Sequence, residues 1–194
     1  MKETLILASR NKGKIKEIEF LLKDSPYAVI GMEAAGFTDD IEETGTTLEE
    51  NAAIKARYLH NKTGQAVLAE DSGLFVDALN GDPGIWSARY AGSHGNDKAN
   101  LQLVLQNMEG QTNRTAHFAA CLCFIDHHGT SHFFKGSLHG TITHEPIGQN
   151  GFGYDPIFIP DGYEVTNAQL NPAVKNSMSH RAEAIGKWLG YLKS

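Results

Sequence analysis

The chain has 194 residues, of which 41% are hydrophobic and 21% are charged, and its formal net charge is -6 at pH 7. Such a length is typical of one compact domain with a sizeable core. The negative net charge argues against a nucleic-acid or membrane partner, because a protein that binds such anionic partners needs a basic face. No signal peptide and no apolar run of the ~18 residues that span a membrane is apparent. Cys121 and Cys123 fit a reducing compartment, so we expect a cytoplasmic protein.

The predicted elements mix strands and helices without strict alternation. The first is a short buried strand over 5–8, followed by a helix whose apolar residues recur at helical spacing up to Leu22. A second helix is predicted from Thr47 towards Leu59, with a capping box at Glu50, and a strand follows in 66–79, interrupted by a polar turn at Glu70–Gly73. A helix over 97–108 precedes two paired strands over 117–125 and 131–138. The chain then has a glycine-rich loop, a strand at 157–159 and a C-terminal helix. This order predicts an α/β fold with a mixed sheet.

The turn between the first strand and the first helix has the composition of an anion site. Its sequence, ASRNKGK over 8–14, keeps the Gly13-Lys14 pair of a Walker A loop but lacks the first glycine, and Ile15 replaces the Mg-binding hydroxyl. A helix N-terminus nevertheless offers unpaired amide groups to an anion. The alternative interpretation is a solvated, lysine-rich helix start. The candidate phosphate-binding residues are Ser9, Arg10, Asn11, Lys12, Gly13 and Lys14.

Two acidic pairs are candidates for holding Mg²⁺, which prefers carboxylate oxygens. Glu42-Glu43 precedes the second helix, and Glu70-Asp71 is predicted to end a strand. In an extended chain successive side chains point apart, so we expect one carboxylate of a pair to face the site. The alternative, an exposed pair of loop glutamates, applies more readily to the first pair than to Asp71.

The loop GFGYDP over 151–156 and the segment before the last helix are candidates for recognising a base. Phe152 or Tyr154 is placed to stack on a base, and Asp155 to accept a hydrogen bond from a ring nitrogen. Cations follow at Lys175, His180 and Arg181, near a helix start. The alternatives are a hairpin turn with packed aromatic side chains and a solvated His-Arg pair.

Six motifs, in this order, resemble those of the inosine triphosphate pyrophosphatase family, which acts on non-standard purine nucleoside triphosphates. They are SRNKGK, EETGTTLEENAAIKA, AEDSGLFVDAL, PGIWSARYAG, GFGYDPIF and KNSMSHRAEA, and the resemblance extends from Leu5 to the last helix. Each motif alone is weak, and the ordered set is specific. The bacterial dITP/XTP pyrophosphatase type is nearest.

The resemblance implies Mg²⁺-dependent hydrolysis of XTP, ITP and dITP to the monophosphate and pyrophosphate, which cleanses the nucleotide pool. It implies an elongated mixed sheet flanked by helices, in a single domain of two lobes with a central active-site cleft, and a homodimer. Asp71 matches the catalytic residue, and Glu43 and Asp71 match the metal ligands. The matched substrate-binding positions are the residues from Ser9 to Lys14, Ser72, Phe152, Gly153, Tyr154, Asp155, Lys175, His180 and Arg181. Arg10 and Glu70 depart from the usual glycine and aspartate.

The chemistry that joins these residues is attack of water on the α-phosphorus while pyrophosphate leaves. Asp71 would orient or deprotonate that water, or hold the metal. His180, Arg181 or nearby amides would donate to the keto oxygen of hypoxanthine or xanthine, whereas the amino group of adenine would place a donor against these donors. The rivals are a pyrophosphatase of modified pyrimidine nucleotides and a nucleotide-binding regulator that does not hydrolyse; an RNA-binding module is disfavoured by the acidic charge.

Overall fold

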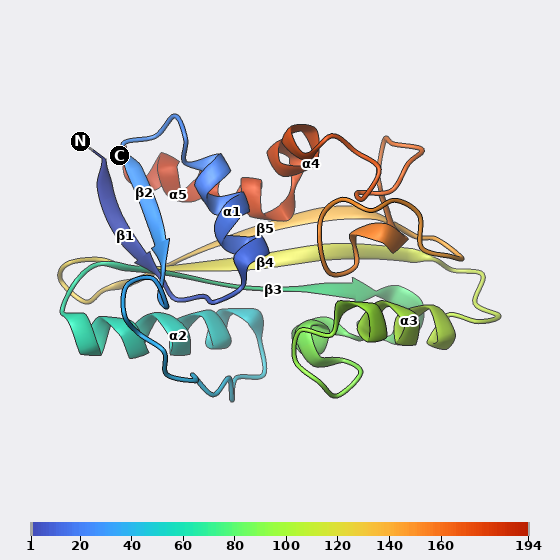
Figure 1. Cartoon of the computed structure of the whole chain (residues 1–194), viewed down its shortest axis with the longest axis horizontal. Helices are drawn as coiled ribbons and strands as arrows, with labels where there is room; N and C mark the ends of the chain where they lie inside the picture. The colour runs from blue at the N-terminus through green and yellow to red at the C-terminus, as the bar shows by residue number, and fades with distance from the viewer. Residues whose placement is uncertain (1, 194) are drawn as a thin grey trace. The chain divides into compact units, whose positions relative to one another are not determined.

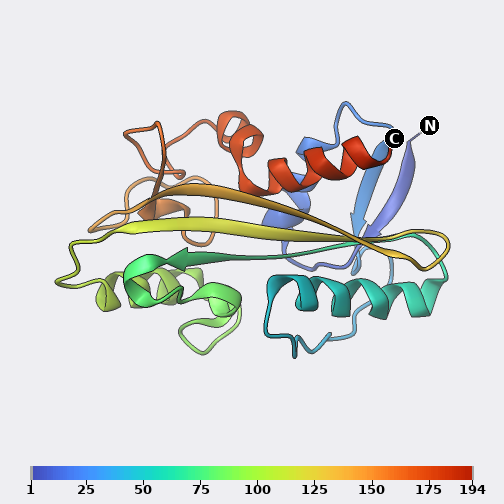
Figure 2. The ribbon, with the colours of Figure 1, turned by 180° about the vertical axis from the view of Figure 1, so that it is seen from behind.

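A computed structural model describes residues 2–193 and contains a six-stranded sheet flanked by helices (Figures 1 and 2). The strand order is β2-β1-β3-β4-β5-β6. The strands are β1 (Glu3–Leu7), β2 (Tyr27–Gly31), β3 (Val67–Val76), β4 (Thr115–Ile125), β5 (Ser131–Ile142) and β6 (Phe158–Pro160). Because β1 pairs in parallel with β2 and β3 while β5 pairs antiparallel with β6, the predicted mixed sheet is confirmed.

The α-helices within residues 2–193 are α1 (Lys12–Leu21), α2 (Leu48–Thr63), α3 (Asp97–Asn107), α4 (Pro172–Met178) and α5 (His180–Tyr191). Short 3-10 turns span Asp77–Leu79, Gly84–Arg89 and Asp155–Ile157. The helix starts follow their polar caps: Asn11 Oδ1 accepts from Lys14 N, and Thr47 Oγ1 accepts from Glu50 N at 3.1 Å. None of these helices combines the length and apolar character that a membrane span requires.

The chain divides into two compact units. Unit 1 contains the chain up to Asp71, the segment Ala120–Gly136 and the chain from Arg181 on, and unit 2 contains Ser72–Ala119 and Ser137–His180. Two predicted motifs are divided by this partition, because Asp71 and Ser72 belong to different units, and so do His180 and Arg181.

Unit 1 has a core on each face of its part of the sheet. Leu5, Leu7 and Leu68 pack with residues of α1 and α5, whereas Ile6, Val67 and Ala69 pack with residues of α2. This separation follows from the two-residue period of a strand, which sends neighbouring side chains to opposite faces. Unit 2 has its own core, in which Leu74 and Val76 of β3 join Leu101 and Val104 of α3 and aromatic residues near β6.

One expectation about β3 is wrong. The polar stretch Glu70–Gly73 was expected to interrupt the strand with a turn, and β3 instead runs unbroken from Val67 to Val76. Glu70 and Asp71 are 1% and 6% exposed, so both carboxylates are buried within the strand. They are tolerated there because each meets a cation, which removes most of the cost of burying a charge.

Candidate functional site

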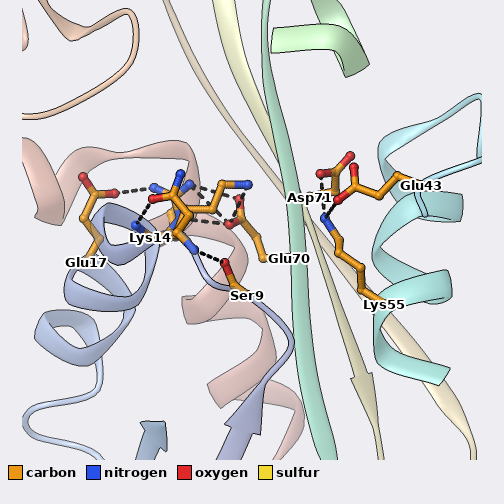
Figure 3. A network of polar contacts seen from close by, with 9 residues as sticks. Ser9, Lys14, Glu17, Glu43, Lys55, Glu70 and Asp71 are labelled. Carbon is orange, nitrogen blue, oxygen red and sulfur yellow. Dashed lines mark hydrogen bonds and ion pairs between the residues drawn. The ribbon is translucent and has the colours of Figure 1, made fainter. Parts of the chain in front are cut away.

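The two acidic residues of β3 point to opposite faces of the strand. Glu70 shares the face of Leu68, towards α1 and α5, and Asp71 shares the face of Val67 and Ala69, towards α2. Figure 3 shows this division, with Glu70 beside Lys14 on one side of β3 and Asp71 beside Lys55 on the other. The two carboxylates therefore have different partners.

Asp71 belongs to a compact charged cluster in unit 1. The Lys55 ammonium donates to Asp71 Oδ1 at 2.9 Å and to Glu43 Oε1 at 2.9 Å. The side chains of Lys55 and Asp71 are 10% and 8% exposed. Burial by itself lowers the pKa of Lys55, but the charges of Asp71 and Glu43 outweigh it and raise the pKa above its usual value. Glu43 rather than Glu42 is the member of its pair that faces the cluster, since Glu42 is exposed. Lys55 was not assigned a role from the sequence.

The residues of this cluster fit a magnesium ion. Asp71 Oδ2 is buried and has no hydrogen-bond partner among residues 2–193, and Glu43 is held against the same ammonium as Asp71. No group of three or more histidine, cysteine or acidic side chains within those residues is arranged to hold a metal. Magnesium sites often take only one or two carboxylates from the protein and complete the shell with water and substrate phosphates. The pair Glu43 and Asp71 meets that description.

Glu70 belongs to a second cluster in unit 1, which links three elements. Arg181, at the start of α5, donates to Glu70 Oε1 at 3.1 Å and also bonds Glu17 of α1. Lys14 Nζ lies 3.5 Å from Glu70 Oε2. Burial alone would lower the pKa of Arg181, but the charges of Glu70 and Glu17 raise it, so the guanidinium stays charged. Glu17 was missed from the sequence, although it lies one helical turn beyond Lys14.

The opening turn is built as a helix start that presents amide and cationic groups. Ser9 Oγ accepts from Asn11 N at 3.2 Å, and Asn11 Oδ1 accepts from Lys14 N at 3.1 Å. Lys12 is exposed, as is Arg10, which forms an ion pair with Asp40. Gly13 lies in the first turn of α1. The turn thus holds Ser9, Asn11 and Lys14 together in unit 1, while Arg10 reaches the segment that leads to Glu43.

β1 ends before the acidic pair of β3 is reached. β1 ends at Leu7, which is paired with Leu68, and Ala8 N donates to Leu68 O at 2.7 Å. Beyond that point β3 continues through Glu70 and Asp71 without β1 beside it. Lys14, paired with Glu70, and Asp71 thus lie on opposite faces of β3 at a stretch of the strand that β1 does not accompany.

In unit 2, the loop before β6 is organised around the Asp155 carboxylate. Asp155 is 4% exposed, and it accepts from Phe152 N at 2.9 Å, Asn167 Nδ2 at 3.2 Å and Lys175 Nζ at 2.7 Å. Gly151 has a positive φ of 78°, and a Cβ there would lie 2.1 Å from Asp155 Oδ2, so only glycine fits. Asp155 and Lys175 therefore fix the shape of the loop. That Asp155 accepts a hydrogen bond from a base stays a prediction.

The two aromatic residues of that loop have different environments. Tyr154 is 5% exposed in the core of unit 2, and its hydroxyl donates to Ser87 O at 2.7 Å. Burial raises its pKa. Phe152 is half-buried, with the Lys175 ammonium 5.0 Å from its ring centroid. Of the two candidates for stacking on a base, Tyr154 is packed in the core and Phe152 is not, so Phe152 is the better candidate. Between them Gly153 N donates to Asp97 Oδ2 at 2.8 Å.

The remaining predicted residues of unit 2 are Ser72 and His180. His180 is 8% exposed, and its ring stacks on Phe118 with centroids 5.1 Å apart. Ser72 is half-buried on β3. A hollow of about 690 Å³ in unit 2, beside the end of α3 and lined in part by Gln106, Arg114 and His144, contains none of the predicted residues.

Comparisons with known proteins identify relatives over nearly the whole chain. The model of the Ham1 family matches residues 5–191. The dITP/XTP pyrophosphatase of Bacillus licheniformis is 46% identical, over 96% of this chain and 96% of its own length. That of Bacillus subtilis is 43% identical, over 96% of this chain and 95% of its own. Solved structures of the Ham1 proteins of Staphylococcus aureus and Coxiella burnetii match with TM-scores of 0.87 and 0.88, at 40% and 39% identity, and each match covers 98% of both chains.

Proposed function

The chain belongs to the Ham1 family, and we propose on that basis that it is a nucleoside triphosphate pyrophosphatase for non-standard purine nucleotides. The substrates are XTP, ITP and dITP, and the products are the nucleoside monophosphate and pyrophosphate. The observation that carries this proposal is similarity over almost the full length to proteins named dITP/XTP pyrophosphatase.

The cationic turn of unit 1 suits the triphosphate of such a substrate. The α1 amide groups, Ser9, Asn11 and Lys14 offer donors to its oxygens, and Lys14 is held within reach by Glu70. Arg10 and Lys12 add charge at the exposed side of the turn. These groups neutralise the charge that develops on the leaving pyrophosphate, which is the main catalytic need of phosphoryl transfer.

Hydrolysis requires one water molecule, whose oxygen bonds to the α-phosphorus as the bond to the bridging oxygen of the leaving pyrophosphate breaks. Asp71, with its unpartnered Oδ2, is the group that orients this water or accepts its proton, or that holds a magnesium ion together with Glu43. Magnesium supplies charge neutralisation of the phosphate oxygens when it is bound. Lys55 keeps the two carboxylates together before substrate arrives.

Recognition of the base is assigned to Phe152 and to donors that bind a keto oxygen at position six of the purine. A site built from hydrogen-bond donors discriminates against an amino group by roughly 10⁴ or more, because the mismatch leaves a buried donor unpaired. His180 and Arg181 are the candidates, although Arg181 already bonds Glu17 and Glu70.

The experiment that tests this proposal is a panel of nucleoside triphosphates assayed for pyrophosphate release with and without Mg²⁺. We expect dITP, ITP and XTP to be hydrolysed far faster than dATP, dGTP, TTP and UTP, and only with the metal. Faster turnover of TTP or UTP would replace the purine assignment with the pyrimidine rival. Tight binding of dITP without any pyrophosphate release would favour a regulator.

A further inference from the structure

The irregular segment that carries Glu43 is fastened along helix α2. We call this segment, residues 38–46, the strap; it follows β2 and runs beside the helix in the direction opposite to it (Figure 1). As the strap residue number rises, the number of its partner on α2 falls. The pairs are Asp39 with Lys62 at 2.8 Å, Glu43 with Lys55 at 2.9 Å, Gly45 N with Asn51 Oδ1 at 2.9 Å, and Thr46 N with Glu50, whose carboxylate the Thr46 hydroxyl also reaches at 2.9 Å.

Among the α2 residues that contact the strap, Asn51 is the one whose presence helix stability alone does not explain. It is fully buried, among Ala52, Ala53 and Ala56, which are also buried. Asparagine is a weaker helix former than alanine, and a buried amide costs free energy unless it is bonded. Asn51 Nδ2 has no hydrogen-bond partner among residues 2–193. The contact from Gly45 N to Asn51 Oδ1 is therefore the reason for a polar side chain at this position.

On the strap, the contact with Asn51 requires a glycine at position 45. A Cβ added to Gly45 would lie 2.6 Å from Asn51 Oδ1 and 2.7 Å from Glu50 Cβ, so any larger residue must lift the strap off the helix. The strap thus approaches α2 as closely as a backbone can.

Asn51 and Lys55 together form a clamp on the part of the strap that matters for catalysis. They are four residues apart on one face of α2, about one helical turn. Their partners on the strap, Gly45 and Glu43, are two residues apart, roughly 6–7 Å in an extended chain. Asn51 holds the backbone, and Lys55 holds the carboxylate and joins it to Asp71.

We propose that Asn51 is a positioning residue for the metal site: it fixes the strap at Gly45 and thereby sets the place of Glu43 opposite Asp71. This role rests on the proposed function, in which Glu43 and Asp71 hold magnesium. In this role Asn51 acts through its contact with Gly45 N and not as a ligand of the metal. Residues that orient a metal ligand in this way typically contribute 10–100-fold to metal affinity.

The test measures the metal directly, with Mn²⁺ as the probe and no nucleotide present. Free Mn²⁺ is followed by electron paramagnetic resonance while the protein is titrated, and exchange of the Gly45 amide hydrogen is followed by NMR. In Asn51→Ala we expect Mn²⁺ affinity to fall about 10–100-fold and Gly45 exchange to accelerate.

Asn100→Ala is the matched control. Asn100 is 1% exposed on α3 in unit 2, and its Oδ1 accepts from Ala91 N at 2.8 Å, so it makes the same kind of contact away from Glu43. Its replacement should lower thermal stability while Mn²⁺ affinity and Gly45 exchange stay as in the wild type. Equal loss of metal affinity in both variants would show a general effect of destabilisation and would overturn the proposal.

Gly45→Ala keeps the test decisive if Asn51→Ala does not fold, because it displaces the strap while Asn51 stays intact. It should weaken Mn²⁺ binding as Asn51→Ala does, and the double variant should be no weaker than either one, since both changes break a single contact. Unchanged Mn²⁺ affinity in either single variant, or additive losses in the double variant, contradicts the clamp. A wild-type protein that binds no Mn²⁺ also overturns it, whereas intact Mn²⁺ binding without nucleotide hydrolysis counts against the proposed function alone.

Discussion

Lys55 is the residue on which the candidate metal cluster depends most. Its ammonium is the cation that two carboxylates from distant parts of the chain share, one from the strap and one from β3. Its raised pKa means that the folded state holds the charged form more tightly than the unfolded chain does. The stability that this gives is therefore complete below pH 10.5, the ordinary pKa of a lysine, and is lost as the pH rises through the higher pKa of the folded state.

Replacing Lys55 with methionine should leave Asp71 and Glu43 facing each other without their cation. We expect Lys55→Met to lower the free energy of unfolding by about 3–5 kcal/mol at neutral pH, the usual cost of removing one member of a buried ion pair. The difference from the wild type should shrink in strongly alkaline buffer, as the wild-type ammonium loses its proton. Urea denaturation of both proteins from neutral to alkaline pH measures this difference; a constant gap across the whole range contradicts it.

Asp71→Asn separates chemistry from binding. The amide keeps the size of the side chain but removes the charge that orients water or binds magnesium, so turnover should fall by at least about 10²–10⁴-fold. Nucleotide binding should persist in part, because the turn from Ser9 to Lys14 is unchanged. Pyrophosphate release and calorimetric titration with dITP give the two quantities. Turnover like that of the wild type would remove Asp71 from the mechanism.

At the scale of the elements, side chains of β3 alternate between its two faces, and the face that carries Glu70 joins α1 and α5 through buried ion pairs. Arg181 is 2% exposed between Glu17 of α1 and Glu70 of β3, so each helix is tied to the other through one guanidinium. On α5 itself, Glu183 and Lys187 form an exposed pair at 2.7 Å with side chains 45% and 53% exposed. Comparing the buried pair Glu17–Arg181 with the exposed pair Glu183–Lys187 shows how burial changes the contribution of a salt bridge to the free energy of unfolding.

Glu17→Gln should be far more damaging than Glu183→Gln. The first leaves a buried guanidinium short of one carboxylate, for which we expect a loss of about 3–5 kcal/mol in the free energy of unfolding. The second removes a solvated i,i+4 pair, which is worth about 0.3–0.5 kcal/mol. Chemical denaturation of the two variants under one set of conditions provides the comparison, and similar losses would contradict the buried network.

The central strand β4 makes the two thiols inert. Cys121 and Cys123 are free and buried, and burial raises their pKa values to about 11 and about 12. Because the thiolate is the reactive form, we expect alkylation in the native protein to be at least roughly 100-fold slower than in the unfolded chain at mildly alkaline pH. Mass spectrometry after timed iodoacetamide treatment measures both rates. Fast labelling of the folded protein would show that β4 is accessible.

Local signals account for the elements that were predicted correctly, and competing signals account for the errors. Thr47 and the capping box at Glu50 predicted the start of α2, because side-chain caps act within a few residues. The sequence Glu70–Gly73 resembles a turn, and only the cations brought by α1, α2 and α5 explain why it stays in a strand. Those partners are distant in the sequence, so no local pattern announces them.

The candidate site shows the same limit. Glu43 and Asp71 were found from their motifs, whereas Lys55 and Asn51 were not, although a signal was present. They are four residues apart on the face of α2 that carries Ala52 and Ala56. Polar side chains on an otherwise small and apolar helix face indicate buried partners. Arg10 offers no such signal, and its ion pair with Asp40 became visible only in the folded chain.

At the scale of the whole molecule, each unit has its own core and its own set of predicted residues. Unit 1 holds the cationic turn, Glu43, Asp71 and Arg181, and unit 2 holds the loop around Asp155 together with Lys175 and His180. The single cleft and the two lobes expected from the sequence stay a prediction. The proposed roles follow this partition only in part: Phe152 and His180 lie in unit 2, whereas Arg181, the other candidate donor to the base, lies in unit 1.

The homodimer is the prediction that belongs to this scale. The family resemblance implies it, and exposed apolar side chains such as Trp86, 50% exposed in unit 2, are available for a partner surface. Size-exclusion chromatography with light scattering should give a mass twice that of one chain at micromolar concentration. A mass equal to one chain across that range would exclude a stable dimer.

The long stretch of sequence between Arg181 and its two carboxylates has a consequence for biosynthesis. Glu17 and Glu70 leave the ribosome long before the arginine that neutralises them, and the core of unit 1 also waits for Ala184, Ile185 and Trp188. Because domains fold as units during synthesis, unit 1 reaches its final packing only once the last helix has been translated. A chain truncated ahead of α5 retains two carboxylates without their guanidinium and an apolar face without its cover.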